Sequence, residues 1–321
     1  MTTAGMGGQV AVMPHDHGHH HHHIDPDAGD RRVALAVGVN LVLTLAQIVG
    51  GLIAGSMALI ADAVHNLSDA VSLIIAFAAR KIARRGNDQD MTFGYARVEI
   101  VSALVNYTTL IVISLYLLWR GAERLINPPG VEGWIVVALA GVALVVDVIT
   151  ALLTWRMAKD SVNIRAAFLH NVADALSSVA VIVAGTLILL YDWRLVDPLV
   201  TIGIAVYILW HAASEIRPVV HILMLGRPPG VDLEAIRAAL VELENIEGVH
   251  HLHLWQIDEK RASVEAHLVL AEQKLPDMPA IVREAKTVLR DRFGIVHSTL
   301  EVETTSIGCA NLHHEEGATA P

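Results

Sequence analysis

The sequence predicts an all-α transmembrane domain of six helices, followed by a small α+β domain in the cytosol. Three observations support this prediction. The 321-residue chain is 54% hydrophobic and only 17% charged, which is too apolar for an ordinary soluble protein. The apolar residues gather within residues 31–218, in runs long enough to cross a bilayer. From residue 219 onwards the pattern changes to that of amphipathic helices and alternating strands.

Residues 1–30 form a polar N-terminal tail that we expect to be disordered. The tail contains His15, His17 and a run from His19 to His23. Two interpretations of this run stay open: a purification tag, and a native tail that collects metal ions. No pattern typical of a cleaved signal precedes the first span, so we expect that span to direct its own insertion.

Hydropathy predicts six spans between residues 31 and 218. Their approximate limits are Arg32–Ala54, Met57–Ala83, Val98–Arg120, Gly133–Met157, Val162–Leu190 and Val196–Ile216. Gly55 and Ser56 leave room only for a tight turn, so the first two spans form an antiparallel hairpin. Basic residues gather before the first span and around the loops that follow the second and fourth spans, whereas the opposite connections hold only Arg120, Arg124 and Arg194. Both chain termini are therefore expected in the cytoplasm.

Residues 219–305 are predicted to form the α+β domain, in the order α-β-β-α-β. The expected elements are a helix at 231–244, strands at 250–257 and 263–270, a helix at 279–292 and a strand at 296–303. From residue 219 to the end the sequence has 9 Lys and Arg against 16 Asp and Glu, an acidic balance that argues against nucleic acid as a partner. Residues 306–321 are expected to be a flexible tail. The single Cys309 excludes an internal disulfide and a multi-cysteine zinc site.

Two copies of a His-x-x-x-Asp pattern lie inside apolar spans: His65 with Asp69, and His170 with Asp174. Residues four apart share one face of a helix. An aspartate at the centre of a span costs about 2.5–3.5 kcal/mol on insertion scales, so ionisable residues there are functional by default. The alternative is that each is only a helix–helix hydrogen-bonding residue, which fits the asparagines of the spans better than these repeated pairs.

The two pairs lie at matching depths. His65 is eight residues from the outer start of its span and His170 is eight residues from the cytoplasmic start of its span, or about 12 Å in each case. Both pairs therefore fall near the middle of the bilayer on antiparallel helices, as in an inverted repeat. Two imidazoles and two carboxylates in a tetrahedron suit Zn²⁺, and histidines can exchange a metal ion for protons.

Two further aspartates lie in the spans. Asp62 is one turn before His65, and it is interpreted either as a residue of the outer mouth or as one that caps the span or pairs locally. Asp147 in the fourth span is a candidate relay or partner of the site.

Several of these motifs resemble those of the cation diffusion facilitators, in the branch that exports zinc and often cadmium or cobalt. The resemblance covers nearly all of Arg31–Glu303. It rests on Ala58–Ala70, on Thr92–Glu99, on His170–Asp174, and on Val249–Trp255 with Ala266–Leu268.

The resemblance implies a homodimeric zinc–proton antiporter of a bacterial inner membrane, in contact with lipid, with a metallochaperone-like cytosolic domain and alternating access. It implies that His65, Asp69, His170 and Asp174 are the transport ligands, and His65 in the first position favours zinc. The loop Arg84–Arg97 lacks the histidines with which some members bind a further zinc ion, so we expect no site there.

A regulatory Zn²⁺ site in the cytosolic domain is a second implication of the resemblance. His250, His267 and His297 fall where such ligands lie, but they do not make a full set. His251 and His253 add candidates, since alternation places both on one face of a strand. Each of these histidines can equally be an ordinary strand or surface residue. In the tail, Cys309, His313 and His314 are expected to be inert.

Two other functions were weighed against transport. A membrane metalloenzyme would keep an open zinc position and a nearby general base, and four protein ligands leave no such position. A metal sensor would use the spans only as an anchor and would not need four buried ligands. The sequence therefore predicts a transporter and not an enzyme.

Overall fold

The computed structural model of the chain describes residues 30–155, 162–304 and 306. The predicted N-terminal tail, with its histidine run, lies outside the described residues except for the first residue of a helix, and so does nearly all of the predicted C-terminal tail, including Cys309. The chain divides into two compact units, a helical one that ends at Val220 and a second one that begins at His221.

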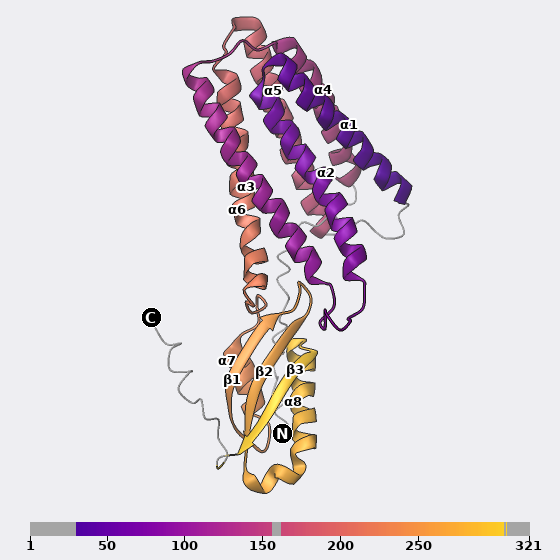
Figure 1. Cartoon of the computed structure of the whole chain (residues 1–321), viewed down its shortest axis with the longest axis vertical. Coiled ribbons are helices and arrows are strands. Elements are labelled where there is room, and N and C mark those ends of the chain that lie inside the picture. Colours follow the sequence, from indigo (N-terminus) through magenta and orange to yellow (C-terminus); the bar gives the residue numbers. More distant parts are fainter. Residues whose placement is uncertain (1–29, 156–161, 305, 307–321) are drawn as a thin grey trace, which may run out of the picture. The chain divides into compact units, whose positions relative to one another are not determined.

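Six long helices make up the first unit (Figure 1). They are α1 (Asp30–Ala54), α2 (Met57–Ala83), α3 (Arg97–Ile126), α4 (Gly133–Trp155), α5 (Val162–Tyr191) and α6 (Val196–Leu223). Among the fully described stretches, four helices are long and apolar enough to cross a membrane, namely α3, α4, α5 and α6. The membrane crossing of α1 and α2 stays a prediction.

Two helices extend beyond their predicted ends. Helix α3 continues to Ile126, because hydropathy marks where the apolar part stops and not where the helix stops. Helix α6 continues through Pro218 to Leu223, past the predicted domain boundary. A proline removes one backbone donor from a helix, but it does not force the chain out of helical geometry at that point.

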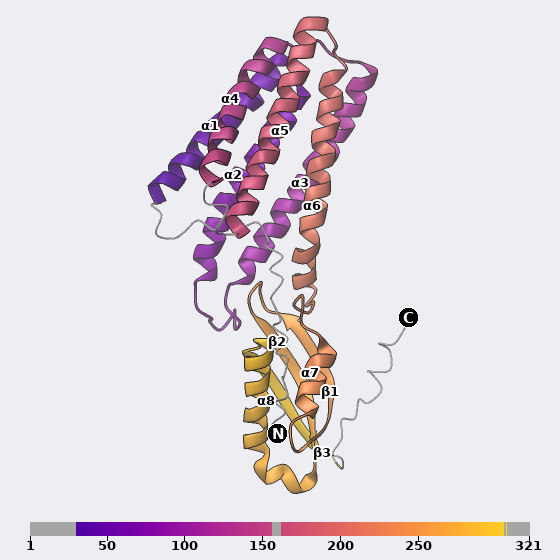
Figure 2. The same cartoon turned by 180° about the vertical axis from the view of Figure 1, so that it is seen from behind.

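Helix α2 has a central place in the bundle. It packs against α1, α3 and α5, while α4 and α5 form the most extensive helix pair (Figure 2). Small residues permit this close approach, since Ala58, Ala61 and Ala63 of α2 are fully buried. Both predicted ligand pairs therefore lie on helices that contact each other.

The start of α2 is fixed by a carboxylate from α6. The backbone N–H groups of Met57 and Ala58 donate to Asp197, at 2.9 and 3.3 Å, and the Ser56 hydroxyl donates to the same side chain. The Leu59 N–H donates in turn to the Ser56 oxygen. These bonds satisfy donors that a helix N-terminus otherwise leaves unpaired.

The second unit is a three-stranded sheet with its helices on one face, as both views show (Figures 1 and 2). Its elements are α7 (Leu233–Val241), β1 (Ile246–Gln256), β2 (Ala262–Leu270), a 3₁₀ turn (Glu272–Asp277), α8 (Met278–Phe293) and β3 (His297–Thr304). Strand β2 pairs antiparallel with β1 and parallel with β3. Apart from the 3₁₀ turn, the described elements follow one another in the order α-β-β-α-β. Apolar residues of the sheet, α7 and α8 form the core, among them Ile236, Leu268 and Leu289.

Candidate metal centre

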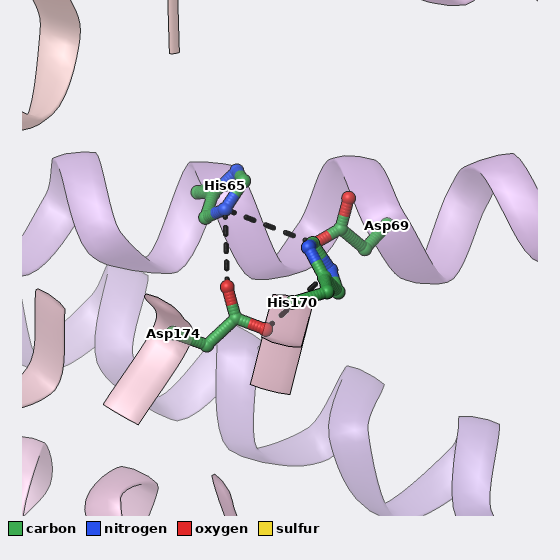
Figure 3. A group of neighbouring side chains, drawn as sticks. All are labelled: His65, Asp69, His170 and Asp174. Carbon is green, nitrogen blue, oxygen red and sulfur yellow. Dashed lines mark hydrogen bonds and ion pairs between the residues drawn. The ribbon is translucent and has the colours of Figure 1, made fainter. Parts of the chain in front are cut away.

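The helices α2 and α5 bring the two His-x-x-x-Asp pairs together (Figure 3). One ligand atom from each of the four residues lies within 4.8 Å of the other three. Nε2 of His65 is 3.2 Å from Oδ1 of Asp174, and Nε2 of His170 is 3.1 Å from Oδ2 of Asp69. The closest contacts therefore run between the two helices, so each pair needs the other to complete the group.

Burial differs within the group. The side chains of His65 and Asp174 are 4% and 10% exposed, whereas those of Asp69 and His170 are 28% and 23% exposed. Among the described residues, neither ring nitrogen of His65 has a hydrogen-bonding partner, and neither does Oδ1 of Asp174. Buried polar atoms normally have partners, so these atoms fit the role of ligands to a cation that the group receives.

The nearby Asp62 is a buried link between helices. It is 1% exposed and accepts hydrogen bonds from Gln47 of α1 at 3.0 Å and from Ser177 of α5 at 2.6 Å. In this conformation it is neither a residue of an open outer mouth nor a helix cap, and its two hydrogen bonds agree with the other interpretation, that it pairs locally. Asp147 accepts a hydrogen bond from Ser178 at 3.0 Å and does not join the four-residue group.

A second group of potential ligands lies on the cytosolic sheet. Atoms of His250, His267 and Glu303 lie within 4.8 Å of one another. Nε2 of His250 is 3.1 Å from Glu303, and Nδ1 of His267 is 2.6 Å from it. His297 lies outside this group, because it begins β3 opposite Ser263 while Glu303 is near the far end of the same strand. Of the three candidate histidines, the group therefore contains His250 and His267 and does not contain His297.

An irregular stretch of β1 changes which histidines meet. The pairing shifts register between His250 and His253, and His251 has a φ of 48°. As a result, the rings of both His250 and His251 contact that of His267, at centroid distances of 5.2 and 4.9 Å. Strict alternation would put consecutive residues on opposite faces, so the sequence pattern could not predict this arrangement.

Sequence reasoning also missed residues around both groups. Glu303 was missed because the search for cytosolic ligands considered histidines. Tyr207 of α6 was missed because tyrosine in a span has many structural roles; its ring meets that of His65 edge-on, with centroids 6.0 Å apart. His211, one turn further along α6, stacks on Tyr207. A histidine inside an apolar span was the signal that could have identified it.

Comparison with known families covers nearly the whole chain. Residues 33–224 match a family described as the cation efflux transmembrane domain, and residues 228–305 match the cytoplasmic domain of cation efflux proteins. The chain belongs to the cation efflux family. The resemblance to the cation diffusion facilitators is thus confirmed.

Curated relatives of this cation efflux protein include three bacterial transporters. A cadmium, cobalt and zinc/H(+)-K(+) antiporter of Bacillus subtilis is 35% identical over 80% of this chain and 84% of its own length. The zinc transporter ZitB of Escherichia coli is 31% identical over 95% and 97%. The metal cation efflux system protein CzcD of Cupriavidus metallidurans is 33% identical over 90% and 89%. The chain is accordingly a metal cation efflux transporter of the membrane and not an enzyme.

Proposed function

We propose that the chain exports Zn²⁺ from the cytoplasm in exchange for protons, through His65, Asp69, His170 and Asp174, by alternating access. The observation that carries the proposal is the convergence of four ligand atoms of two kinds, two imidazole nitrogens and two carboxylate oxygens, within 4.8 Å. This donor set suits Zn²⁺, and the related ions Cd²⁺ and Co²⁺ are further candidate substrates. The names of the relatives, which include a zinc transporter and an antiporter, agree with it.

Charge balance in the bundle supports the coupling to protons. Two carboxylates neutralise one dication, so the loaded group has no net charge from these residues. After the ion leaves, two carboxylates would face each other in a poorly solvated place, which is costly. Protonated imidazoles beside them restore neutrality, and each histidine lies within 4.0 Å of both aspartates. Protons and Zn²⁺ therefore compete for the same four side chains.

Uptake of Zn²⁺ by liposomes that contain the purified protein tests this proposal. An imposed pH gradient is expected to drive zinc uptake, with protons moving the other way. His65→Ala and Asp174→Ala are each expected to abolish uptake while the helical content stays unchanged. Ser214→Ala is the matched control, because Ser214 is exposed on α6 and bonds only to the backbone of its own helix. Normal transport by the His65 and Asp174 variants would show that the ion passes elsewhere.

The same variants separate transport from sensing. A sensor that uses the spans only as an anchor would keep its response to zinc in Asp174→Ala, because its receptor would be the cytosolic domain. A transporter loses flux in that variant.

A regulatory Zn²⁺ bound by the cytosolic domain is a second proposal, favoured by His250, His267 and Glu303. Nε2 of His250 is buried and makes no hydrogen bond to any described residue, although it lies 3.1 Å from a Glu303 oxygen. Two imidazoles and a carboxylate fit zinc, which would hold β1, β2 and β3 together there.

We further propose that the chain works as a homodimer, as the resemblance implies.

Zinc titration of the full-length protein tests the cytosolic site. His250→Ala is expected to remove one class of bound zinc and to leave the membrane site intact, whereas His297→Ala is expected to change nothing. Equal losses in the two variants would contradict the assignment.

A further inference from the structure

One face of α6 continues from the four-ligand group with further polar side chains. The Tyr207 ring meets the His65 ring edge-on, and the His211 ring lies nearly parallel to Tyr207, with an interplanar angle of 6° and centroids 6.4 Å apart. Glu215 follows one turn later on the same face. Ionisable side chains inside a membrane helix raise the free energy of insertion. Their presence on one face of α6 therefore indicates a function.

His211 lacks the contacts that usually explain a polar side chain within a helix bundle. Within the described part of the chain it makes no hydrogen bond and no ion pair, and its ring contact is the stack on Tyr207. It is only partly buried. A polar side chain kept for helix packing would instead bond to a neighbouring helix, as Ser177 does to Asp62.

The more exposed residues of the four-residue group indicate from which end of the bundle an ion would reach His211. Asp69 follows His65 along α2, and His170 precedes Asp174 along α5. Because these two helices are antiparallel, the two more exposed ligands lie toward the same end of the bundle. That end carries the loop after α2, which is rich in basic residues, and it is the end expected in the cytoplasm.

Helix α6 runs toward the same end, because a short turn at residues 192–195 reverses the chain after α5. His211 therefore lies beyond Tyr207 on the accessible side of the group. The Tyr207 ring, which contacts both the His65 and the His211 rings, connects it to the four-residue group.

We propose that His211 captures incoming Zn²⁺ on the accessible side and passes it to Asp69 and His170, before His65 and Asp174 complete the coordination. This inference rests on the proposed function and names a further residue of the same path. Imidazole is a good zinc ligand, and two of the final four ligands are accessible without any movement of the helices. Tyr207 positions the His211 ring by stacking and separates it from His65.

Transport kinetics in liposomes test the capture role. His211→Ala is expected to raise the KM for zinc presented at the accessible side by about tenfold and to leave kcat unchanged, because the four final ligands are intact. His211→Phe, which keeps the stack on Tyr207 but has no ligand atom, is expected to behave like His211→Ala. His211→Cys, which restores a zinc ligand, is expected to lower the KM most of the way back to the wild-type value. An unchanged KM in the Ala and Phe variants, or no recovery with Cys, would overturn the proposal.

A binding measurement tests the inference independently of transport. The His65→Ala protein keeps Asp69, His170 and Asp174, and the capture role predicts that it holds a weakly bound zinc ion with the help of His211. The double variant His65→Ala/His211→Ala is expected to lose this ion, while His65→Ala/Ser214→Ala retains it, as read by equilibrium dialysis with Zn²⁺. Equal zinc binding in the two double variants contradicts the capture role, even if transport by the wild-type protein is normal. Loss of binding only in the His211 double variant, without transport by the wild type, would leave capture intact and overturn the proposed function alone.

Discussion

The donor atoms of individual residues determine which ion the membrane group prefers. His65 contributes a nitrogen ligand, and nitrogen favours zinc over harder ions such as Mn²⁺. His65→Asp would give the group three carboxylates and one imidazole. We expect zinc affinity to fall by at least about tenfold and uptake of manganese to rise relative to zinc. A metal-by-metal uptake series in liposomes with an imposed pH gradient checks this, and an unchanged ratio of zinc to manganese uptake would contradict it.

Asp62 is predicted to matter for stability and not for zinc binding. Asp62→Ala leaves the buried Gln47 amide without its acceptor, at a cost of about 1–3 kcal/mol, and removes the bond from the half-buried Ser177 hydroxyl. Thermal unfolding in detergent, with zinc and with a chelator, measures the effect. The loss of stability is expected to be the same under both conditions. If zinc no longer stabilises the variant, Asp62 belongs to the metal centre after all.

The convergence of the two His-x-x-x-Asp pairs was predictable from sequence, because helical spacing and span direction determine the faces on which the four side chains lie. The surroundings were not predictable, since Gln47 and Ser177 meet Asp62 only after three helices have packed. Glu303 is a similar case. It becomes a partner of His250 and His267 through pairing of β2 with β3, which residue types alone do not indicate.

At the scale of elements, α2 depends on a carboxylate that comes from another helix. Asp197 is 1% exposed and accepts two backbone bonds from the first turn of α2. Asp197→Ala is expected to destabilise the helical unit by about 1–3 kcal/mol, because buried donors lose their acceptor. Thermal unfolding in detergent checks this. Asp192→Ala is the control, because Asp192 is exposed and pairs with Arg194 at the surface. Equal melting temperatures for the two variants would contradict the capping role.

The elements themselves were largely predictable, and the exceptions have physical causes. The apolar runs of α2 and α5 begin where the helices begin, so the distance of each motif from the start of its helix was predicted correctly. The pairing shift in β1 was not predictable, because it depends on His251 adopting a positive φ that L-residues seldom take. Hydropathy also could not indicate that α6 continues through Pro218.

At the scale of the whole molecule, the antiparallel order of α2 and α5 gives the metal centre two different sides. Toward the α1–α2 turn, Asp62 links α2 to α1 and α5 by hydrogen bonds, while the more exposed side chains of Asp69 and His170 lie toward the other end. With both termini in the cytoplasm, as predicted, this conformation would be the one that loads an ion for export. The direction of transport thus depends on the orientation of the chain.

The single cysteine provides a test of that orientation. Cys309 lies in the C-terminal tail, and both termini are predicted to be cytoplasmic. A membrane-impermeant maleimide is therefore expected to label Cys309 in inside-out vesicles and not in intact spheroplasts. The matched control is Trp193→Cys in a Cys309→Ala background, because Trp193 is exposed in the turn between α5 and α6 and should be labelled from the opposite side. Labelling of Cys309 in intact spheroplasts would reverse the assigned orientation. The accessible side of the metal centre would then face away from the cytoplasm, and this conformation would be the one that releases the ion.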